Sequence, residues 1–205
     1  MCIIKKHSIT LHRKINDLEI VLRPLSDEHF PYLYKWNADP DVLYWCEYDD
    51  VEAYSPEMVR QIYGIVSQNA LCFIVEVNGI FIGECWLQKM NLPNVTAMYP
   101  EGTDIRRIDM VIGEKDYWGR GLGTRFIKML IDYAFTTEKA DVLHCFSEDY
   151  NIRSRRVWEK NGFKKILTED IANSAKAKQQ YHWRLTKEDY QVLLTKIVQP
   201  SEMMR

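Results

Sequence analysis

The sequence lacks the features that mark several common classes of protein. Its five cysteines are scattered through 205 residues and form no Cys-x-x-Cys pair, which argues against a disulfide framework and a zinc site. No apolar run is long enough for a membrane span, and no signal peptide is recognisable. The net charge of −2 argues against binding nucleic acid by phosphate neutralisation. We therefore expect a cytoplasmic protein without a metal, nucleic-acid or membrane partner, either a monomer or a homodimer.

Two nucleotide-binding motifs and the usual covalent catalytic sets are also missing. No Gly-Lys-Ser/Thr follows a glycine at the P-loop spacing, and Phe126 stands where a dinucleotide fingerprint needs its third glycine. No Ser/His/Asp or Cys/His arrangement is recognisable, so a serine or cysteine nucleophile is not indicated.

The composition is that of a globular protein, with 46% apolar and 27% charged residues. We expect a single domain, with residues 1–17 as an N-terminal arm or extra strand, residues 18–185 as the core, and residues 186–205 as a C-terminal helix and tail. Apolar periodicity and turn residues predict a mixed α/β fold, a central sheet with helices on its faces. The expected strands are 18–23, 71–77, 80–89, 105–112, 141–146, 163–167 and 181–185, and the expected helices are 26–37, 55–68, 122–134, 151–161 and one beginning near 186.

Local signals fix some boundaries. Asn78-Gly79 predicts a type I′ turn between two antiparallel strands. Pro40 is expected to end the helix before it, residues 44–54 show no clear period, and residues 91–103 are expected to form a loop.

The most informative stretch runs from a strand at residues 105–112 through a glycine turn into an amphipathic helix. Gly121 and Gly123 stand at the start of that helix, where backbone N–H groups lack partners and an anion can approach closely. Arg120, Arg125 and Lys128 add positive charge nearby. The pattern indicates a phosphate-binding turn, although a tight turn with ordinary surface cations is the alternative.

Two motifs in this order of elements resemble those of the GNAT superfamily of acetyl-CoA-dependent N-acetyltransferases. Trp118-Gly-Arg-Gly-Leu-Gly123 is similar to the family's pyrophosphate turn, with Trp118 in place of the leading Gln or Arg. Residues 151–163 resemble the family's Asn-x-x-Ala/Ser…Tyr-x-Lys-x-Gly-Phe. Residues 78–83, 108–113 and 117–126 look most like aminoglycoside 6′-N-acetyltransferases. The resemblance implies a mostly antiparallel mixed sheet flanked by helices, and acetyl-CoA as acyl donor.

The resemblance also assigns residues to the coenzyme. Backbone groups at residues 110–112 are expected to meet the pantetheine arm, residues 119–124 the pyrophosphate, and Asn151 the coenzyme from the next strand–helix junction. The full expected set is Met110, Val111, Ile112, Trp118, Gly119, Arg120, Gly121, Leu122, Gly123, Thr124, Asn151 and Ser154.

Asp109 is the expected catalytic residue. In relatives of this type an Asp at this position handles the proton of the substrate amine, whereas a strand carboxylate paired with a neighbouring arginine is the alternative. An aspartate is too weak a base to deprotonate an alkylammonium outright, so we expect Asp109 to anchor the ammonium and relay its proton. Trp158 stands where family members carry a Tyr general acid, which leaves Tyr150, water or no acid for the thiolate.

Carboxylates and aromatic side chains suit a polycationic amino sugar. The expected acceptor wall is the segment at residues 45–52 opposite acids on the sheet, although a solvated acidic loop is the alternative for any one residue. Phe146-Ser147 stands where many such enzymes have Asp-Pro, so Glu148 and Asp149 are expected to substitute. The expected acceptor residues are Trp45, Glu47, Tyr48, Asp49, Glu84, Asp109, Glu148 and Asp149, with Asp50, Glu52 and Asp104 nearby.

The leading interpretation is acetyl transfer by direct attack of an aminoglycoside amine, the 6′-amine, which would confer antibiotic resistance. Acylation of another small amine, such as a hydroxylated lysine in siderophore assembly, is the second. An acyl-CoA-binding regulatory module without turnover is the third.

Overall fold

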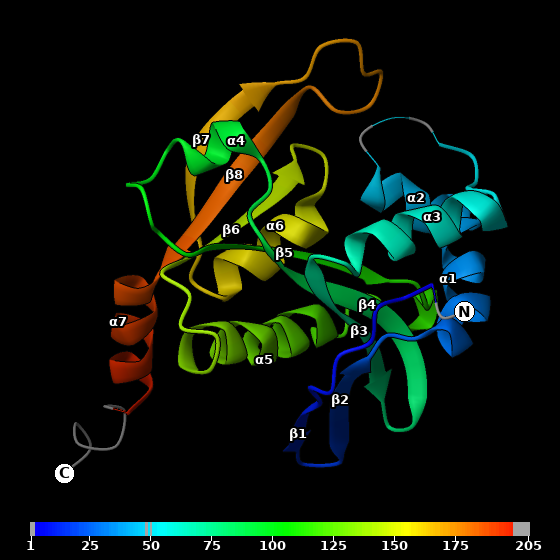
Figure 1. Ribbon diagram of the computed structural model, residues 1–205, viewed down its shortest axis with the longest axis horizontal. Coiled ribbons are helices and arrows are strands. Elements are labelled where there is room, and N and C mark those ends of the chain that lie inside the picture. The colour runs from blue at the N-terminus through cyan, green and yellow to red at the C-terminus, as the bar shows by residue number, and fades with distance from the viewer. Residues whose placement is uncertain (1–2, 48, 50, 199–205) are drawn as a thin grey trace.

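One mixed sheet forms the centre of the molecule (Figure 1). The computed structural model describes residues 3–47, 49 and 51–198, and within them eight strands have the spatial order β1-β2-β3-β4-β5-β6-β8-β7. Neighbouring strands are antiparallel except β5 and β6, which are parallel. The mixed, mostly antiparallel sheet confirms the expected fold class. The strands are β1 (Leu11–Ile15), β2 (Leu18–Pro24), β3 (Ala70–Val77), β4 (Ile80–Lys89), β5 (Ile105–Ile112), β6 (Val142–Glu148), β7 (Lys164–Asp170) and β8 (Gln179–Thr186).

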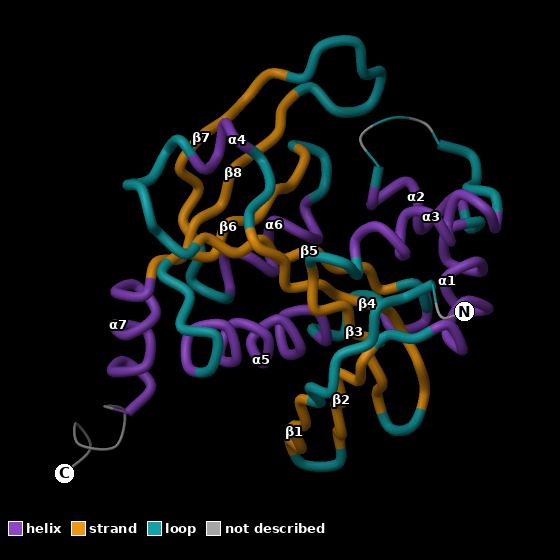
Figure 2. Tube along the Cα trace, in the orientation of Figure 1, coloured by secondary structure: helices purple, strands orange, loops and turns teal. Residues whose placement is uncertain are grey.

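Helices cover both faces of this sheet (Figure 2). They are α1 (Phe30–Asn37), α2 (Pro40–Cys46), α3 (Pro56–Val66), α4 (Pro93–Thr96), α5 (Leu122–Thr136), α6 (Ile152–Lys160) and α7 (Lys187–Val198), with 3-10 turns at Asp27–His29 and Lys115–Tyr117. None of the helices that the structure describes has the length and apolarity that a membrane crossing needs.

Two separate hydrophobic cores result, because alternate residues of a strand point to opposite faces. Phe73 of β3 packs in a core with Phe126 and Leu130 of α5, which we call the α5 core. Its neighbour Ile74 packs with Leu33 of α1 and residues of α3, in what we call the α1–α3 core. The two cores place α5 on one face and α1–α3 on the other.

Most expected elements are present, and two helices were not expected. The first helix ends at Asn37 as predicted, but Pro40 also begins a new helix, α2, with Asp39 as the N-cap whose carboxylate accepts a hydrogen bond from the Asp41 N–H. Proline is tolerated in the first turn because its missing N–H would have no helical partner there. The segment at residues 91–103, expected as a loop, contains the single turn of α4. The turn at Asn78-Gly79 is confirmed, with φ angles of 49° and 81°.

The expected N-terminal arm contains a real strand. β1 pairs with β2 from Leu11↔Leu22 to Ile15↔Leu18, and Ile4 is buried in the α1–α3 core.

A break in strand pairing opens the middle of the sheet. The parallel pairing of β5 and β6 runs from Ile105↔Val142 to Arg107↔His144 and then stops, although β5 continues to Ile112. The edge of β5 beyond Arg107 is therefore left for side chains, helix ends or a ligand. Both pockets described below lie along this part of β5.

Candidate functional site

The glycine turn before α5 has the backbone geometry that a phosphate site needs. Gly119 and Gly121 have φ angles of 73° and 72°, in the left-handed region that other residues adopt at a cost, and a Cβ at either would meet nothing within 4 Å. These glycines are therefore required by the turn and leave its outer surface open. The first N–H groups of α5 have no helical acceptor, and the helix dipole adds partial positive charge there.

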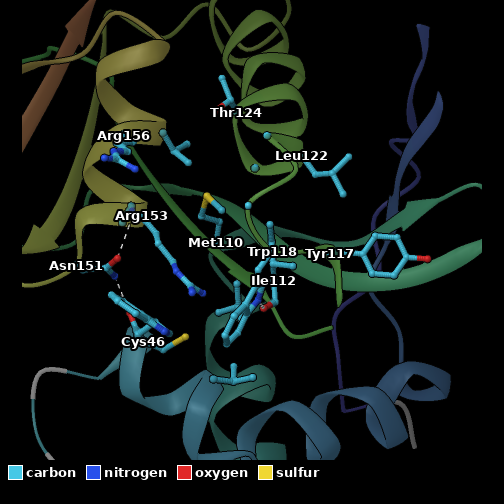
Figure 3. A pocket seen from close by; sticks show the side chains of 18 of the residues that line it. Cys46, Met110, Ile112, Tyr117, Trp118, Leu122, Thr124, Asn151, Arg153 and Arg156 are labelled. Atoms are coloured by element: carbon cyan, nitrogen blue, oxygen red, sulfur yellow. Dashed lines mark hydrogen bonds between the residues drawn. The ribbon is translucent and has the colours of Figure 1, made fainter. Parts of the chain in front are cut away.

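A pocket of about 450 Å³ lies against this turn, and we call it the glycine pocket (Figure 3). Eleven of the twelve residues expected at the coenzyme line it, namely Met110, Val111, Ile112, Trp118, Gly119, Gly121, Leu122, Gly123, Thr124, Asn151 and Ser154. Arg120 does not line it; its guanidinium lies over the Tyr117 ring, 5.4 Å from the centroid. The lining also includes three cations that were not expected: Arg153, Arg156 and Lys160.

An arginine sandwiched by two tryptophans forms one wall of the glycine pocket. The Arg153 guanidinium lies 4.5 Å from the Trp45 ring centroid and 4.3 Å from that of Trp118. Trp118 is held in turn by a 2.6 Å hydrogen bond from its indole Nε1 to the Ile112 carbonyl. Trp118, which departs from the family motif, thus positions a cation at the pocket (Figure 3).

Asn151 connects α6 to the end of α2. Its Oδ1 accepts a hydrogen bond from the Ser154 N–H at 3.0 Å, which caps α6, and its Nδ2 donates to the Trp45 carbonyl at 2.6 Å. The Asn151 amide is therefore engaged with the protein itself, and it lines the pocket while holding the segment that carries Trp45.

A second pocket of about 400 Å³ adjoins the first, and we call it the acidic pocket. Its lining includes four carboxylates from four elements: Glu47 after α2, Glu84 of β4, Asp109 of β5 and Glu148 of β6. Seven residues line both pockets, namely Val42, Trp45, Cys46, Met110, Val111, Asn151 and Ser154. The two pockets therefore meet along β5.

Glu84 is the most deeply buried of the four acids, with 2% of its surface exposed. Its Oε1 accepts a hydrogen bond from the Tyr63 hydroxyl at 3.4 Å, and its Oε2 has no partner within the described residues. Burial, reinforced by the charge of Asp109, raises the pKa of Glu84 to about 8. A carboxyl poised near neutral pH, with an unpaired oxygen at a pocket, is suited to accept a proton.

Asp109 lies on the same face of the sheet and is paired. Its Oδ1 accepts a hydrogen bond from the Arg107 guanidinium at 2.7 Å, while its buried Oδ2 has no partner among the described residues. Arg107 is held over the Phe146 ring at 5.3 Å. Asp109 thus combines the arginine-paired strand carboxylate, which was the alternative interpretation, with an oxygen left unpaired beside the pocket.

Of the other expected acceptor residues, some line the acidic pocket and some do not. Trp45, Glu47 and Glu148 line the acidic pocket, and burial raises the pKa values of both glutamates. Asp149 lines neither pocket, and its Oδ1 accepts hydrogen bonds from the backbone N–H groups of Tyr150 and Lys178.

Three of the remaining acids stand apart from both pockets. Asp49 and Glu52 are exposed, and Asp104 is paired with Arg106. Tyr48 and Asp50 lie outside the described residues.

Tyr150, the side chain considered as an acid for the leaving thiolate, lines neither pocket, and its hydroxyl is bonded to the backbone, as is the indole of Trp158. The Trp158 Nε1 donates to the Phe146 carbonyl at 3.3 Å. The Tyr150 hydroxyl shares its one proton between the carbonyls of Tyr44 at 2.9 Å and Glu47 at 2.7 Å, and burial raises the pKa of Tyr150 above its ordinary value.

Sequence reasoning missed the aromatic and cationic partners of the site. Tyr63 and Trp86 line the acidic pocket, but α3 and β4 carry them far from the glycine motif in sequence. The alternation of β4 does put Trp86 on the same face as Glu84, and that of β5 puts Arg107 beside Asp109, so strand periodicity was the signal that could have found both.

Comparison with known proteins identifies the family. Residues 19–164 match the family described as "Acetyltransferase (GNAT) domain". This chain belongs to the GNAT acetyltransferase family. It is an N-acetyltransferase, and its acyl donor is acetyl-CoA.

Individual relatives of this GNAT protein are distant. An aminoglycoside N(6′)-acetyltransferase type 1 of Klebsiella pneumoniae is 24% identical over 166 residues, covering 79% of this chain and 81% of the relative. A spermidine N(1)-acetyltransferase of Escherichia coli (strain K12) is 27% identical over 145 residues, 70% of this chain and 72% of the relative. The crystal structure of aminoglycoside acetyltransferase AAC(6′)-Ib with coenzyme A has a TM-score of 0.67 at 20% identity, covering 84% of this chain and 98% of that one.

Proposed function

We propose that this GNAT protein transfers the acetyl group of acetyl-CoA to a primary amine of a polycationic small molecule, with the 6′-amine of an aminoglycoside as the first candidate. The acidic pocket carries this proposal. Four carboxylates there border the glycine pocket, and two of them, Glu84 and Asp109, each have a buried oxygen without a partner among the described residues. Leaving such oxygens unpaired is costly, and an ammonium group would satisfy them.

The glycine pocket fits the coenzyme. The outward surface of the turn at Gly119 and Gly121 suits a pyrophosphate, and Arg153, Arg156 and Lys160 supply positive charge around it. The unpaired edge of β5 beyond Arg107 offers backbone groups to the pantetheine arm. When bound, acetyl-CoA supplies the thioester carbonyl that the amine attacks.

The chain's own residues hold the acceptor and take its proton. An alkylammonium must lose a proton before its nitrogen can attack, and Glu84 and Asp109 lie on the face of the sheet where that proton can be accepted. The attack is direct, because no histidine lines either pocket in the described chain, and burial together with the nearby carboxylates raises the pKa of the Cys46 thiol, which disfavours a thiolate nucleophile.

The test is an acceptor screen by thiol release from acetyl-CoA, with kanamycin and spermidine as probes. We expect Asp109→Asn to lower turnover by about 10²-fold and to leave coenzyme A binding, measured by calorimetry, unchanged. Asp116→Asn makes the same chemical change at an exposed site outside both pockets, and it should behave as the wild type. Absence of thiol release with any polycationic amine would overturn the proposed acceptor class.

A polyamine is the second candidate acceptor. The E. coli relative named as a spermidine N(1)-acetyltransferase is as similar to this chain as the aminoglycoside relative. The ratio of kcat/KM for kanamycin and spermidine in the same screen decides between the two.

A further inference from the structure

A lysine side chain from the β7–β8 loop reaches across to α2 and the segment that follows it. The Lys176 Nζ donates hydrogen bonds to the carbonyls of Tyr44 at 2.9 Å and Asp49 at 3.3 Å. It also lies 4.8 Å from the centroid of the Tyr44 ring and 4.9 Å from that of Tyr150. Two aromatic faces and two carbonyl oxygens therefore surround one primary ammonium group, and we call this arrangement the ammonium cage.

The cage is built independently of Lys176. The Tyr150 hydroxyl shares its one proton between the carbonyls of Tyr44 and Glu47, and the two tyrosine rings lie with their centroids 5.5 Å apart. Asn151 holds the intervening Trp45 carbonyl. These bonds join α2 to the turn after β6, so the two tyrosine rings and the Tyr44 carbonyl are held in place without the lysine.

The cage adjoins the acidic pocket. Glu47 contributes its carbonyl to the bond that fixes Tyr150 and its side chain to the pocket lining. Burial raises the pKa values of Glu47 and Glu148, and the charge of Lys176 acts on both carboxyls in the opposite direction. An ammonium in the cage is thus within electrostatic reach of two pocket carboxylates.

We propose that the ammonium cage is a second cation subsite for the acceptor, and that Lys176 fills it as a tethered competitor until a distal ammonium of a polycationic amine displaces it. This inference rests on the proposed function, because it requires an acceptor with more than one ammonium group. The Lys176 ammonium is chemically the same group as a terminal amine of such a molecule. Carbonyl oxygens and aromatic faces recognise a primary ammonium whatever chain carries it.

Competition by Lys176 predicts the direction in which polycation affinity changes when the lysine is replaced. A tethered group has a high effective concentration at its own site, so the acceptor's second ammonium must displace it at a cost. Removing the lysine's charge should therefore strengthen the binding of polycations. If Lys176 served only to fasten the loop over the pocket, its removal would loosen the acceptor wall and weaken their binding.

The experiment is calorimetric titration of kanamycin, spermidine and the monoamine propylamine into the coenzyme A complex of the wild type and Lys176→Met. Methionine keeps much of the apolar stem and removes the charge. We expect the variant to bind both polycations about 3- to 10-fold more tightly and propylamine unchanged, because only a polycation reaches both sites. Thermal unfolding of each variant verifies that the fold is intact.

Lys178→Met is the matched control. It makes the same charge change in the same loop, but the Lys178 Nζ bonds to the Ser174 carbonyl, away from the cage, so its polycation affinities should stay at wild-type values. Equal or weaker binding of polycations by Lys176→Met, or equal gains in both variants, overturns the subsite and leaves the proposed function standing. Failure of wild type and variant alike to bind either polycation overturns the acceptor class, and the subsite with it.

Discussion

The two pockets that meet along β5 differ in the chemical groups that they offer to a ligand. The glycine pocket is lined by the glycine turn together with residues of α2, β5, α5 and α6, and it offers backbone N–H groups at the turn and cations from α6. The acidic pocket takes its four carboxylates from the residue after α2 and from β4, β5 and β6, so its charge comes from side chains of distant segments. A backbone site depends on conformation and tolerates side-chain change, whereas a side-chain site depends on each residue. The donor site is therefore expected to be the constant part of this enzyme and the acceptor site the variable part.

The largest expected effect is a loss of turnover caused by a change in the acidic pocket that leaves coenzyme A binding in the glycine pocket unchanged. Glu84→Gln keeps the size of the side chain and its hydrogen bond from Tyr63 but removes the proton acceptor, so turnover should fall by about 10²-fold or more. Coenzyme A affinity, measured by calorimetry, should not change. Glu57→Gln on the exposed start of α3 is the control, and a comparable loss of coenzyme affinity in Glu84→Gln would mean that the pockets are not separate.

The next effect tests the backbone site. Gly121→Ala forces a residue with a Cβ to adopt a φ of 72°, which should cost about 1–2 kcal/mol of stability and, by distorting the turn, about tenfold in coenzyme A affinity. Gly79→Ala has the same kind of strain, at a φ of 81° with open space around it, in a hairpin far from the pocket. The two variants should lose similar melting temperature, and only Gly121→Ala should bind coenzyme A more weakly. Equal coenzyme affinities in both would contradict the assignment of the turn.

A smaller effect comes from the pH dependence of the acceptor site. At pH 7 Glu84, with its pKa raised to about 8, holds its proton in the unliganded enzyme, and a cationic acceptor favours the ionised form. Polycation affinity should therefore rise about fivefold between pH 7 and pH 8, with about one proton released per acceptor bound at pH 7. Titrations in buffers of different ionisation enthalpy measure this proton. Glu84→Gln should abolish the release, and coenzyme A binding should show no such release in either protein.

The smallest effect concerns the cation between the two tryptophans. Arg153→Met should weaken coenzyme A binding about threefold and make it less dependent on salt, because one charge near the phosphates is lost. Arg155→Met, whose guanidinium lies over Tyr181 and which lines neither pocket, is the matched control. A salt dependence identical in Arg153→Met and wild type would show that Arg153 does not face the phosphates.

The same contrast explains how much the sequence alone could predict. The strand, glycine turn and helix beside the glycine pocket are contiguous, so their periodicity and turn residues predicted these elements and a phosphate-binding turn, while the resemblance to the GNAT superfamily supplied the individual lining residues. The acceptor site depends on distant segments meeting in space, so its acids were expected, but Tyr63, Arg107 and Lys176 were not. The helix that begins at Pro40 was missed for a related reason: a proline that follows one helix can also begin the next, and only the N-cap at Asp39 indicates the second.

The division of the apolar interior into two cores has a consequence for how this enzyme can diversify. The helices α1 to α3 are stabilised by their own cluster of side chains, while α5, which begins at the glycine turn, is stabilised on the opposite face of the sheet. Side chains of α1 and α3 can therefore be exchanged without repacking α5, whereas α2 supplies Val42, Trp45 and Cys46 to the glycine pocket and is constrained by it. Substitutions in the helices on the α1–α3 face can therefore change the acceptor specificity while the packing of α5 on the opposite face stays the same.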